Sequence, residues 1–274
     1  MAEPKERADI LLVEQGHFPS REKAKAAIMA GIVYADGVPV DKAGMKVNRS
    51  ATIHVKGAVH PYVSRGGLKL EKALREFSID VTDRVMLDIG ASTGGFTDCA
   101  LQHGARYVYA IDVGYNQLDW SLRQDERVCV MERTNFRYMT TDDIRGPTPN
   151  FASIDVSFIS LRIILPPLVA LLDKPAAIVA LIKPQFEAGR DKVGKNGVVR
   201  DHDVHVEVLQ SILRFANELG LQLSGLTFSP ITGGEGNIEF LAYWRISVEP
   251  LDDRIVDLEE AAARTVQEAS RTFT

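Results

Sequence analysis

From residue 85 onward, short apolar runs alternate with longer stretches in which apolar residues recur every three or four positions. The apolar runs are the predicted strands: Val85–Ile89, Tyr107–Asp112, Val128–Met131, Phe151–Val156 and Ala176–Ile182. The predicted helices follow Gly95 and cover Leu161–Leu172 and His202–Leu219. Strands separated by helical stretches of this length favour the α/β class, with a mainly parallel, doubly wound sheet.

Two further apolar runs close this region. Leu221–Phe228 and Glu239–Arg245 are joined by a glycine-rich loop that is too short for a crossover helix. Parallel neighbours need a crossover of a dozen or more residues, so these runs are predicted to pair antiparallel at one edge of the sheet. Ligands of a doubly wound sheet bind at the carboxyl ends of its strands. The predicted residues at these ends are Asp88, Asp112, Asp155 and Lys183.

The first sixty residues have a different pattern, which predicts a small α+β module. Its predicted helices are Arg7–Gln15 and Arg21–Ala30, the second with Ser20 as N-cap and Gly31 as its stop. Ile32–Val40 alternates around Asp36-Gly37, a strong hairpin signal, and Thr52–Val55 is a further predicted strand. A linker over residues 61–67, rich in glycine and proline, joins this module to a domain over residues 68–250.

The tail over residues 251–274 shows a helical stripe with polar residues opposite. Its apolar positions are Ile255, Leu258, Ala262, Val266, Ala269 and Phe273. This spacing predicts an amphipathic helix that docks on the body or pairs between the subunits of an oligomer.

Charge is unevenly spread along the chain. The net charge is −5, but residues 1–60 hold nine Lys and Arg against seven Asp and Glu, and the rest holds 23 against 30. Residues 1–60 are therefore slightly basic and the rest of the chain is acidic, and a basic patch suits a polyanionic partner. Cys99 and Cys129 fit no metal spacing and predict reduced thiols. The start of the chain lacks an apolar signal segment and no apolar run approaches membrane-spanning length, so we expect a cytoplasmic protein without a membrane partner.

The segment Val85–Phe96 carries the strongest ligand signal: a strand, a glycine bend and then a helix. This arrangement brings a ligand close to backbone N–H groups, and glycine permits the tight turn. A dinucleotide site favours G-x-G-x-x-G, whereas Ser92 stands where the second glycine belongs. The pattern D-x-G-x-x-x-G-G is similar to the first motif of S-adenosylmethionine (SAM)-dependent methyltransferases. The cofactor-binding residues that it implies are Asp88, Gly90, Ala91, Ser92, Thr93, Gly94, Gly95 and Phe96.

The second predicted strand strengthens this interpretation. It ends in Asp112, about 20 residues after the glycine bend. At this spacing a carboxylate accepts hydrogen bonds from ribose hydroxyls of a nucleoside cofactor. Alone, Asp112 is more simply a turn-capping aspartate, but together with the bend it predicts a cofactor contact.

The N-terminal module resembles an S4 RNA-binding domain. The resemblance rests on residues 20–31, a basic helix with a glycine stop, followed by the hairpin over residues 33–40. It implies that Arg21, Lys23 and Lys25 contact RNA phosphates, which supplies affinity more than sequence readout. The simpler alternative is that these three residues lie on a solvent-exposed helix face and contact no RNA.

Four residues of the larger domain resemble the Lys-Asp-Lys-Glu tetrad of FtsJ-like ribose 2′-O-methyltransferases: Lys69, Asp155, Lys183 and Glu239. With the S4-like head in front, the chain to about residue 247 resembles the TlyA (hemolysin A-like) ribosomal RNA methyltransferase family. The resemblance implies a Rossmann-like sheet, SAM as cofactor, and ribosomal RNA or ribosomal subunits as partner. It also implies that Asn135 and Phe136 border the adenine, and that Asp155 borders the cofactor.

The implied chemistry needs a base, because a ribose 2′-hydroxyl is a poor acid. A lysine kept neutral by burial and by a nearby cation is a suitable base, while Asp155 orients it and Glu239 holds Lys69 or the ribose. The sequence does not decide which lysine is neutral. No metal is required, since SAM carries its own leaving group.

The loop over residues 185–203, directly after Lys183, is glycine-rich and basic in places. We expect a mobile substrate loop, with an ordinary surface loop as the alternative. Three residues of this loop, Arg190, Lys192 and Lys195, are predicted to contact RNA. Arg65, in the linker before the larger domain, is a further predicted RNA contact.

Three other functions remain open. A nicotinamide-dependent oxidoreductase would use a similar bend, but Ser92 and the lack of a proton-relay motif count against it. A non-catalytic RNA-binding or ribosome-assembly factor would not need the tetrad. A membrane-active role, suggested by the hemolysin name of the family, has no apolar spanning segment behind it.

Overall fold

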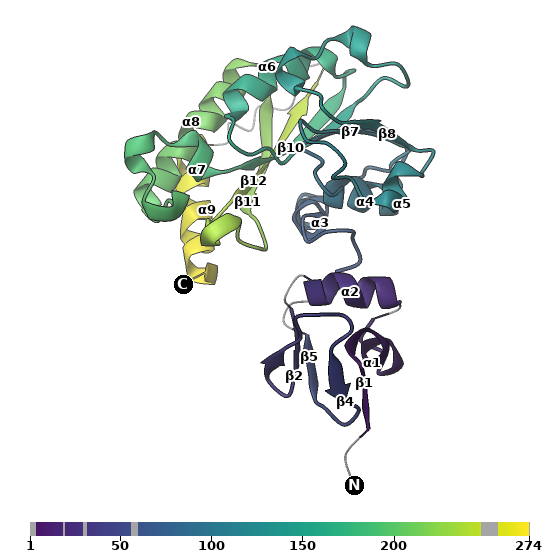
Figure 1. The fold of residues 1–274 in the computed structure, drawn as a ribbon. Coiled ribbons are helices and arrows are strands. Elements are labelled where there is room, and N and C mark those ends of the chain that lie inside the picture. The colour runs from purple at the N-terminus through teal and green to yellow at the C-terminus, as the bar shows by residue number, and fades with distance from the viewer. Residues whose placement is uncertain (1–3, 19, 30–31, 56–59, 248–256, 274) are drawn as a thin grey trace. The chain divides into compact units, whose positions relative to one another are not determined.

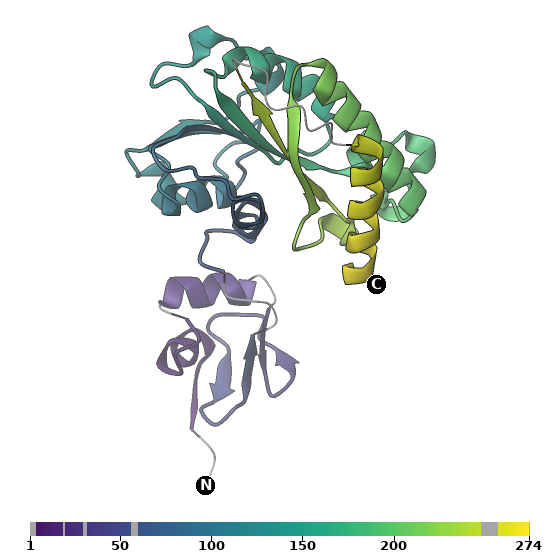
Figure 2. The same ribbon diagram turned by 180° about the vertical axis from the view of Figure 1, so that it is seen from behind.

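The computed structural model describes residues 4–18, 20–29, 32–55, 60–247 and 257–273. Figures 1 and 2 show the ribbon from opposite sides. The chain forms two compact units, Met1–Val59 and His60–Thr274.

The larger unit is built on one seven-stranded sheet in the order β11-β12-β10-β9-β6-β7-β8. Its strands are β6 (Val85–Ile89), β7 (Tyr107–Ile111), β8 (Val128–Met131), β9 (Phe151–Ile154), β10 (Ala176–Ile182), β11 (Gln222–Phe228) and β12 (Phe240–Ile246). The strands from β10 to β8 pair in parallel, whereas β12 runs antiparallel to both β10 and β11. This confirms the predicted mainly parallel sheet with an antiparallel pair at one edge.

Helices cover both faces of this sheet (Figures 1 and 2). On one face lie α3 (Gly67–Glu76), α4 (Gly95–Gln102) and α5 (Trp120–Arg123), and on the other α6 (Leu161–Leu171), α8 (His202–Glu218) and α9 (Leu258–Phe273). Successive strand residues point to opposite faces, so Met86 joins the core under α3 and α4, and Leu87 joins the core under α6 and α8. The doubly wound architecture follows from burying both faces of a parallel sheet.

Short elements connect the strands and helices of this unit. They are α7 (Pro184–Glu187) and the 3-10 turns η1 (Phe136–Tyr138), η2 (Thr141–Asp143), η3 (Arg190–Lys192), η4 (Lys195–Gly197) and η5 (Gly234–Gly236). Several of them follow the carboxyl ends of strands, where a doubly wound fold builds its site.

The C-terminal helix α9 packs against α8 and β11 of its own chain. Val266 and Ala269 are buried, and the Phe273 ring meets the Phe228 ring edge-on, with 5.9 Å between centroids. Of the two alternatives for this helix, the structure shows docking on the body. Ile255, the first position of the predicted stripe, lies outside the described residues.

The N-terminal unit contains α1 (Ala8–Glu14), α2 (Arg21–Met29) and the antiparallel strands β2 (Val33–Ala35), β3 (Val38–Pro39) and β5 (Ile53–Val55). Asp36 and Gly37 have φ of +50° and +78°, as a tight hairpin turn between β2 and β3 requires. A second pair, β1 (Lys5–Arg7) with β4 (Lys46–Asn48), was not predicted because three-residue polar strands leave no alternating pattern. Arg7 belongs to β1, so the first helix begins at Ala8 rather than at Arg7.

Candidate active site

The glycine bend between β6 and α4 runs too close to its neighbours for side chains at Gly90, Gly94 and Gly95. A Cβ on Gly90, whose φ is +84°, would lie 2.4 Å from the carbonyl oxygen of Asp155. A Cβ on Gly95 would lie 2.3 Å from Ser64 Oγ. Ser92 also has a positive φ, +48°, and its amide donates to Asp112 Oδ2 at 2.8 Å. The bend is therefore a tightly held turn that leaves space above its backbone.

Asp88 supports the bend from below. Its carboxylate is fully buried and accepts hydrogen bonds from Thr97 Oγ1 at 2.6 Å and Ser153 Oγ at 2.8 Å. Burial raises the pKa of Asp88 to about 6, although the two hydroxyls partly offset this effect. Asp88 does not line the cavity described below, so the structure places it in the support of the turn rather than at a cofactor surface.

Asp112 follows β7 and is half-buried beside the bend. Its Oδ2 accepts from the Ser92 amide, and its Oδ1 accepts from the Gly114 amide at 2.7 Å. Each carboxylate oxygen retains a lone pair for a further donor. The predicted ribose acceptor is thus fixed against the glycine bend.

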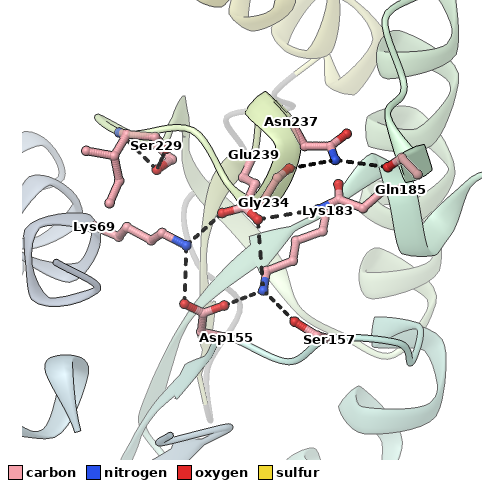
Figure 3. A network of polar contacts seen from close by, with 11 residues as sticks. Lys69, Asp155, Ser157, Lys183, Gln185, Ser229, Gly234, Asn237 and Glu239 are labelled. Atoms are coloured by element: carbon pink, nitrogen blue, oxygen red, sulfur yellow. Dashed lines mark hydrogen bonds and ion pairs between the residues drawn. The ribbon is translucent and has the colours of Figure 1, made fainter. Parts of the chain in front are cut away.

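The structure brings the four predicted catalytic residues together (Figure 3). Lys69 lies on α3, Asp155 follows β9, Lys183 follows β10, and Glu239 immediately precedes β12. Asp155 lies between the two ammonium groups, with Oδ2 3.3 Å from Lys69 Nζ and Oδ1 2.5 Å from Lys183 Nζ. Glu239 Oε2 is 2.7 Å from Lys69 Nζ, and its Oε1 is 4.0 Å from Lys183 Nζ.

Within this buried cluster, Lys69 and Asp155 stabilise each other in their charged forms. Lys69 is 7% exposed and Glu239 is 2% exposed. Burial lowers the pKa of Lys69, but the charges of Asp155 and Glu239 outweigh burial and leave that pKa raised. Burial likewise raises the pKa of Asp155, but Lys69 and Lys183 outweigh it and leave that pKa lowered. Lys69 is therefore an ammonium and Asp155 a carboxylate at neutral pH.

Lys183 has different surroundings from Lys69. Its Nζ has one close carboxylate, Asp155, and donates to the neutral hydroxyl of Ser157 at 3.2 Å, whereas Lys69 has close contacts with two carboxylates. The strand before Lys183 is wholly apolar, and Pro184 begins α7 directly after it. This local sequence fixes the side chain at the end of β10.

A cavity of about 590 Å³ joins the glycine bend to the tetrad. The bend contributes Gly90, Ala91, Ser92, Gly95 and Phe96, and all four tetrad residues line the same space. Further lining residues come from the segment before α3 and from the loops around η4 and η5: Ser64, Arg65, Gly66, Asn196, Gly197, Gly233, Gly234, Glu235 and Asn237. One cavity thus holds a nucleoside-type cradle and a polar cluster next to it.

Several predicted cofactor residues do not line this cavity, and Asp112 is one of them. Phe136 is buried in the core, where α6 packs on η1. Asn135 caps η1, because its side chain accepts from the Arg137 amide at 3.3 Å. Thr93 and Gly94 shape the end of the bend, with Gly94 in the left-handed region before α4. The Thr134 amide donates to the Asp112 carbonyl, which places this loop next to the acid rather than on the cavity wall.

The predicted RNA-binding residues lie in two units. In the N-terminal unit, Arg21, Lys23 and Lys25 are all exposed, and Arg21 also donates to the buried Asp9 at 2.7 Å, which stabilises the fold. In the larger unit, Arg65 lines the cavity. Arg190, Lys192 and Lys195 are exposed on the loop after α7, and Lys192 is paired with Glu207.

Sequence reasoning missed several residues of the cavity wall: Ser157, Phe158, Gln185, Phe186 and Asn237. Phe158 is 91% exposed with a φ of +64°, and its ring lies 4.9 Å from that of Phe186. An exposed phenylalanine in a strained conformation has no signature in a hydrophobicity pattern. The available signal was proximity, since each of these residues stands within three positions of a predicted catalytic residue.

Among the residues that the structure describes, no helix combines the length and the apolar surface needed to cross a bilayer.

Comparison with known families identifies both units. The model of the FtsJ-like methyltransferase family matches residues 62–245, and that of the S4 domain matches residues 6–53. A Bacillus subtilis (strain 168) protein named "Putative rRNA methyltransferase YqxC" is 58% identical over 273 residues, which cover 100% of this chain and 97% of that protein.

Two further relatives extend this result. The 16S/23S rRNA (cytidine-2'-O)-methyltransferase TlyA of Mycobacterium tuberculosis (strain ATCC 25618 / H37Rv) is 42% identical over 266 residues, covering 96% of this chain and 97% of that protein. The solved structure of a "Putative hemolysin from Streptococcus thermophilus" is 50% identical, with a TM-score of 0.75 and coverage of 99% of both chains. The tetrad, the bend and these full-length similarities lead to one conclusion: the chain belongs to the TlyA family, in which an S4 domain precedes an FtsJ-like methyltransferase domain.

Proposed function

We propose that this protein transfers a methyl group from S-adenosylmethionine to a ribose 2′-hydroxyl of ribosomal RNA. The observation that carries the proposal is the Lys69–Asp155–Lys183–Glu239 cluster on the wall of the cavity that begins at the glycine bend. The names of the relatives support the reaction, because the Mycobacterium tuberculosis TlyA is an rRNA (cytidine-2'-O)-methyltransferase.

The residues of the bend fit the cofactor. Gly90 and Gly95 let the bend pack closely against the Asp155 carbonyl oxygen and Ser64, and Asp112 presents carboxylate oxygens beside the exposed backbone of Ser92. These residues would hold the methionine and ribose parts of S-adenosylmethionine, and Phe96 would border it. When bound, the cofactor supplies a methyl group activated on a sulfonium. Asp88 keeps the turn in shape through Thr97 and Ser153.

The two lysines have different parts in this proposal. Lys69 stays protonated because two carboxylates raise its pKa, so its charge is available to stabilise the developing alkoxide of the ribose. Proton acceptance then falls to Lys183, whose Nζ faces the cavity beside Ser157.

The carboxylates orient the lysines. Asp155 contacts both ammonium groups, and Glu239 fixes Lys69 at 2.7 Å. Holding the acceptor and the charged groups in place lowers the barrier mainly through proximity and preorganised electrostatics. The chemistry requires no metal at this site.

In this proposal the first sixty residues bind the RNA and residues 68–250 carry out catalysis. Residues 61–67 link the two parts. Lys23 and Lys25 of α2 are exposed for phosphates, with Arg21 engaged by Asp9. Arg65, Arg190 and Lys195 would continue the contact near the cavity. A partner of this kind places the protein in the cytoplasm, where ribosomal RNA and S-adenosylmethionine meet.

The test is transfer of a labelled methyl group from S-adenosylmethionine to separated ribosomal subunits. The expected product is RNA that resists alkaline cleavage at one labelled nucleotide, because a 2′-O-methyl group blocks attack on the phosphate. Binding of NAD alone would favour the oxidoreductase alternative. RNA binding without any methyl transfer would favour a non-catalytic assembly factor.

A further inference from the structure

Two loops that line the cavity outside the glycine bend have matching backbone conformations. In η4, Asn196 and Gly197 have φ of +62° and +72°, and in η5, Glu235 and Gly236 have φ of +55° and +85°. The first residue of each pair carries a side chain in the left-handed region, which costs free energy unless surrounding contacts hold it. Something in the structure must therefore keep both turns in place.

The side chain of Asn237 joins the two turns. It is 4% exposed, and its Nδ2 donates to the carbonyl oxygens of Gly197 and Gly234, both at 3.0 Å. Figure 3 shows Asn237 beside Gly234 and Glu239. Its Oδ1 accepts from the Val199 amide at 3.1 Å. One buried amide thus satisfies three backbone groups on two loops that are about 40 residues apart in sequence.

A second buried side chain, that of His205, fixes the backbone beside η4. His205, in the first turns of α8, is buried, and its Nε2 lies 3.0 Å from the Val199 carbonyl oxygen, so that nitrogen carries the proton. Val199 is consequently fixed through its amide by Asn237 and through its carbonyl by His205.

This link also reaches the catalytic cluster. Asn237 stands two residues before Glu239, and a Cβ on Gly233 would lie 2.3 Å from Glu239 Oε1, so the η5 loop packs directly on that carboxylate. Gln185 Nε2, at the start of the segment that leads to η4, donates to the same oxygen at 3.4 Å. The described hydrogen bonds of Asn237 connect the two loops to each other, and the η5 loop packs against Glu239; none of these bonds goes to Gly90–Phe96.

We propose that Asn237 is a positioning residue that locks the η4 and η5 loops into one wall for the RNA substrate. This inference rests on the proposed function for the identity of the substrate. The wall exists only while both loops are joined, so loss of the Asn237 amide releases both turns from their strained conformations. RNA binding then weakens, while cofactor binding at the glycine bend is retained.

The test compares Asn237→Ala with the control Asn217→Ala, which removes an exposed asparagine near the end of α8. In Asn237→Ala, KM for RNA should rise about tenfold or more, because the three hydrogen bonds that join the two loops are lost. The dissociation constant for S-adenosylmethionine should stay within about twofold of wild type, since the bend makes none of these bonds. Unchanged KM, or an equal loss of cofactor affinity, would overturn the proposal.

Hydrogen exchange on the free protein gives a readout that is independent of activity. Amides of residues 193–199 and 233–237 should exchange faster in Asn237→Ala and as in wild type in Asn217→Ala. Asn237→Asp keeps the acceptor for Val199 but loses both donations, so it should show an intermediate effect; it also serves if the alanine variant does not fold. Wild-type protection of both loops in Asn237→Asp would contradict the link. Absence of methyl transfer by the wild type would instead refute the proposed function.

Discussion

Lys69 and Lys183 share the carboxylate of Asp155, but their environments assign them different chemistry. Lys69 has two close carboxylates and remains charged in spite of burial, whereas Lys183 has one and a neutral hydroxyl. The sequence identified all four members of this cluster but left the lysines interchangeable. The distinction needed distances, because the Coulomb contribution of a carboxylate depends on its separation from the ammonium.

Asp88 gives a prediction about stability and pH. Its pKa is about 6 in the folded protein, against an ordinary value of 3.8, because the carboxyl is buried. Between these values the folded state binds the extra proton, so this residue's contribution to the free energy of unfolding is largest below pH 3.8 and is lost as the pH rises through 6. A shift of this size corresponds to about 3 kcal/mol.

Urea unfolding of wild type and Asp88→Asn between pH 4 and 7 measures this effect. The wild type should lose stability relative to the variant as the pH rises, since asparagine has no proton to lose. Parallel pH profiles for the two proteins would contradict the buried position of the carboxyl. The neighbouring exposed Asp83→Asn should follow the wild-type profile.

Among the elements of the fold, those with a strong period were predictable from sequence. The strands β6 to β10, the helix α8 and the antiparallel pair β11–β12 all lie where apolar spacing placed them. The short strands β1 and β4 and the turns η4 and η5 were not predictable, because hydrogen bonds to distant groups form them rather than local pattern. Asn237 and Phe158 were missed for the same reason: their partners are visible only in three dimensions.

The strand–bend–helix element gives a second prediction. Gly90→Ala should reduce S-adenosylmethionine affinity by about tenfold or more, because its Cβ would lie 2.4 Å from the Asp155 carbonyl oxygen and force the bend to move. Calorimetric titration with the cofactor measures the change.

Gly220→Ala is the matched control for this prediction. Gly220 also has a positive φ, +79°, but nothing lies within 4 Å of its added Cβ. It should therefore lose some stability from backbone strain and keep its cofactor affinity. Equal affinities for the two variants would show that the close approach at Gly90 does not shape the site.

We propose that the molecule divides RNA delivery and chemistry between its two units. The sequence anticipated both, because each carries its own motif: a basic helix with a hairpin in the first, and a glycine bend with strand-end charges in the second. The sequence grouped Arg21 with Lys23 and Lys25, and all three are exposed, but Arg21 also has a partner within the fold. Arg21 donates to Asp9, which is fully buried, so its removal would disturb the fold of the unit.

The exposed pair Lys23 and Lys25 gives the prediction for the N-terminal unit. The double variant Lys23→Ala/Lys25→Ala should bind ribosomal RNA more weakly. The slope of the logarithm of its binding constant against the logarithm of salt concentration should become smaller in magnitude by roughly 1 to 2, as expected when phosphate contacts are lost. Filter binding over a series of salt concentrations measures both quantities. Cofactor affinity should not change.

Lys174→Ala, an exposed lysine of the larger unit, is the control for charge alone. An equal drop in RNA affinity for the control and the double variant would indicate a general charge effect. That result would contradict a specific contact between α2 and RNA phosphates.

Single-turnover methyl transfer to ribosomal subunits by wild type, Lys183→Ala and Lys174→Ala tests the central claim most directly. With S-adenosylmethionine and RNA both saturating, the rate constant of Lys183→Ala should fall by roughly 10²–10⁴, the usual contribution of a proton acceptor. Lys174→Ala should match the wild type. A Lys183→Ala rate constant equal to that of the wild type, with the same labelled nucleotide, would contradict the assignment of Lys183 and the mechanism built on it.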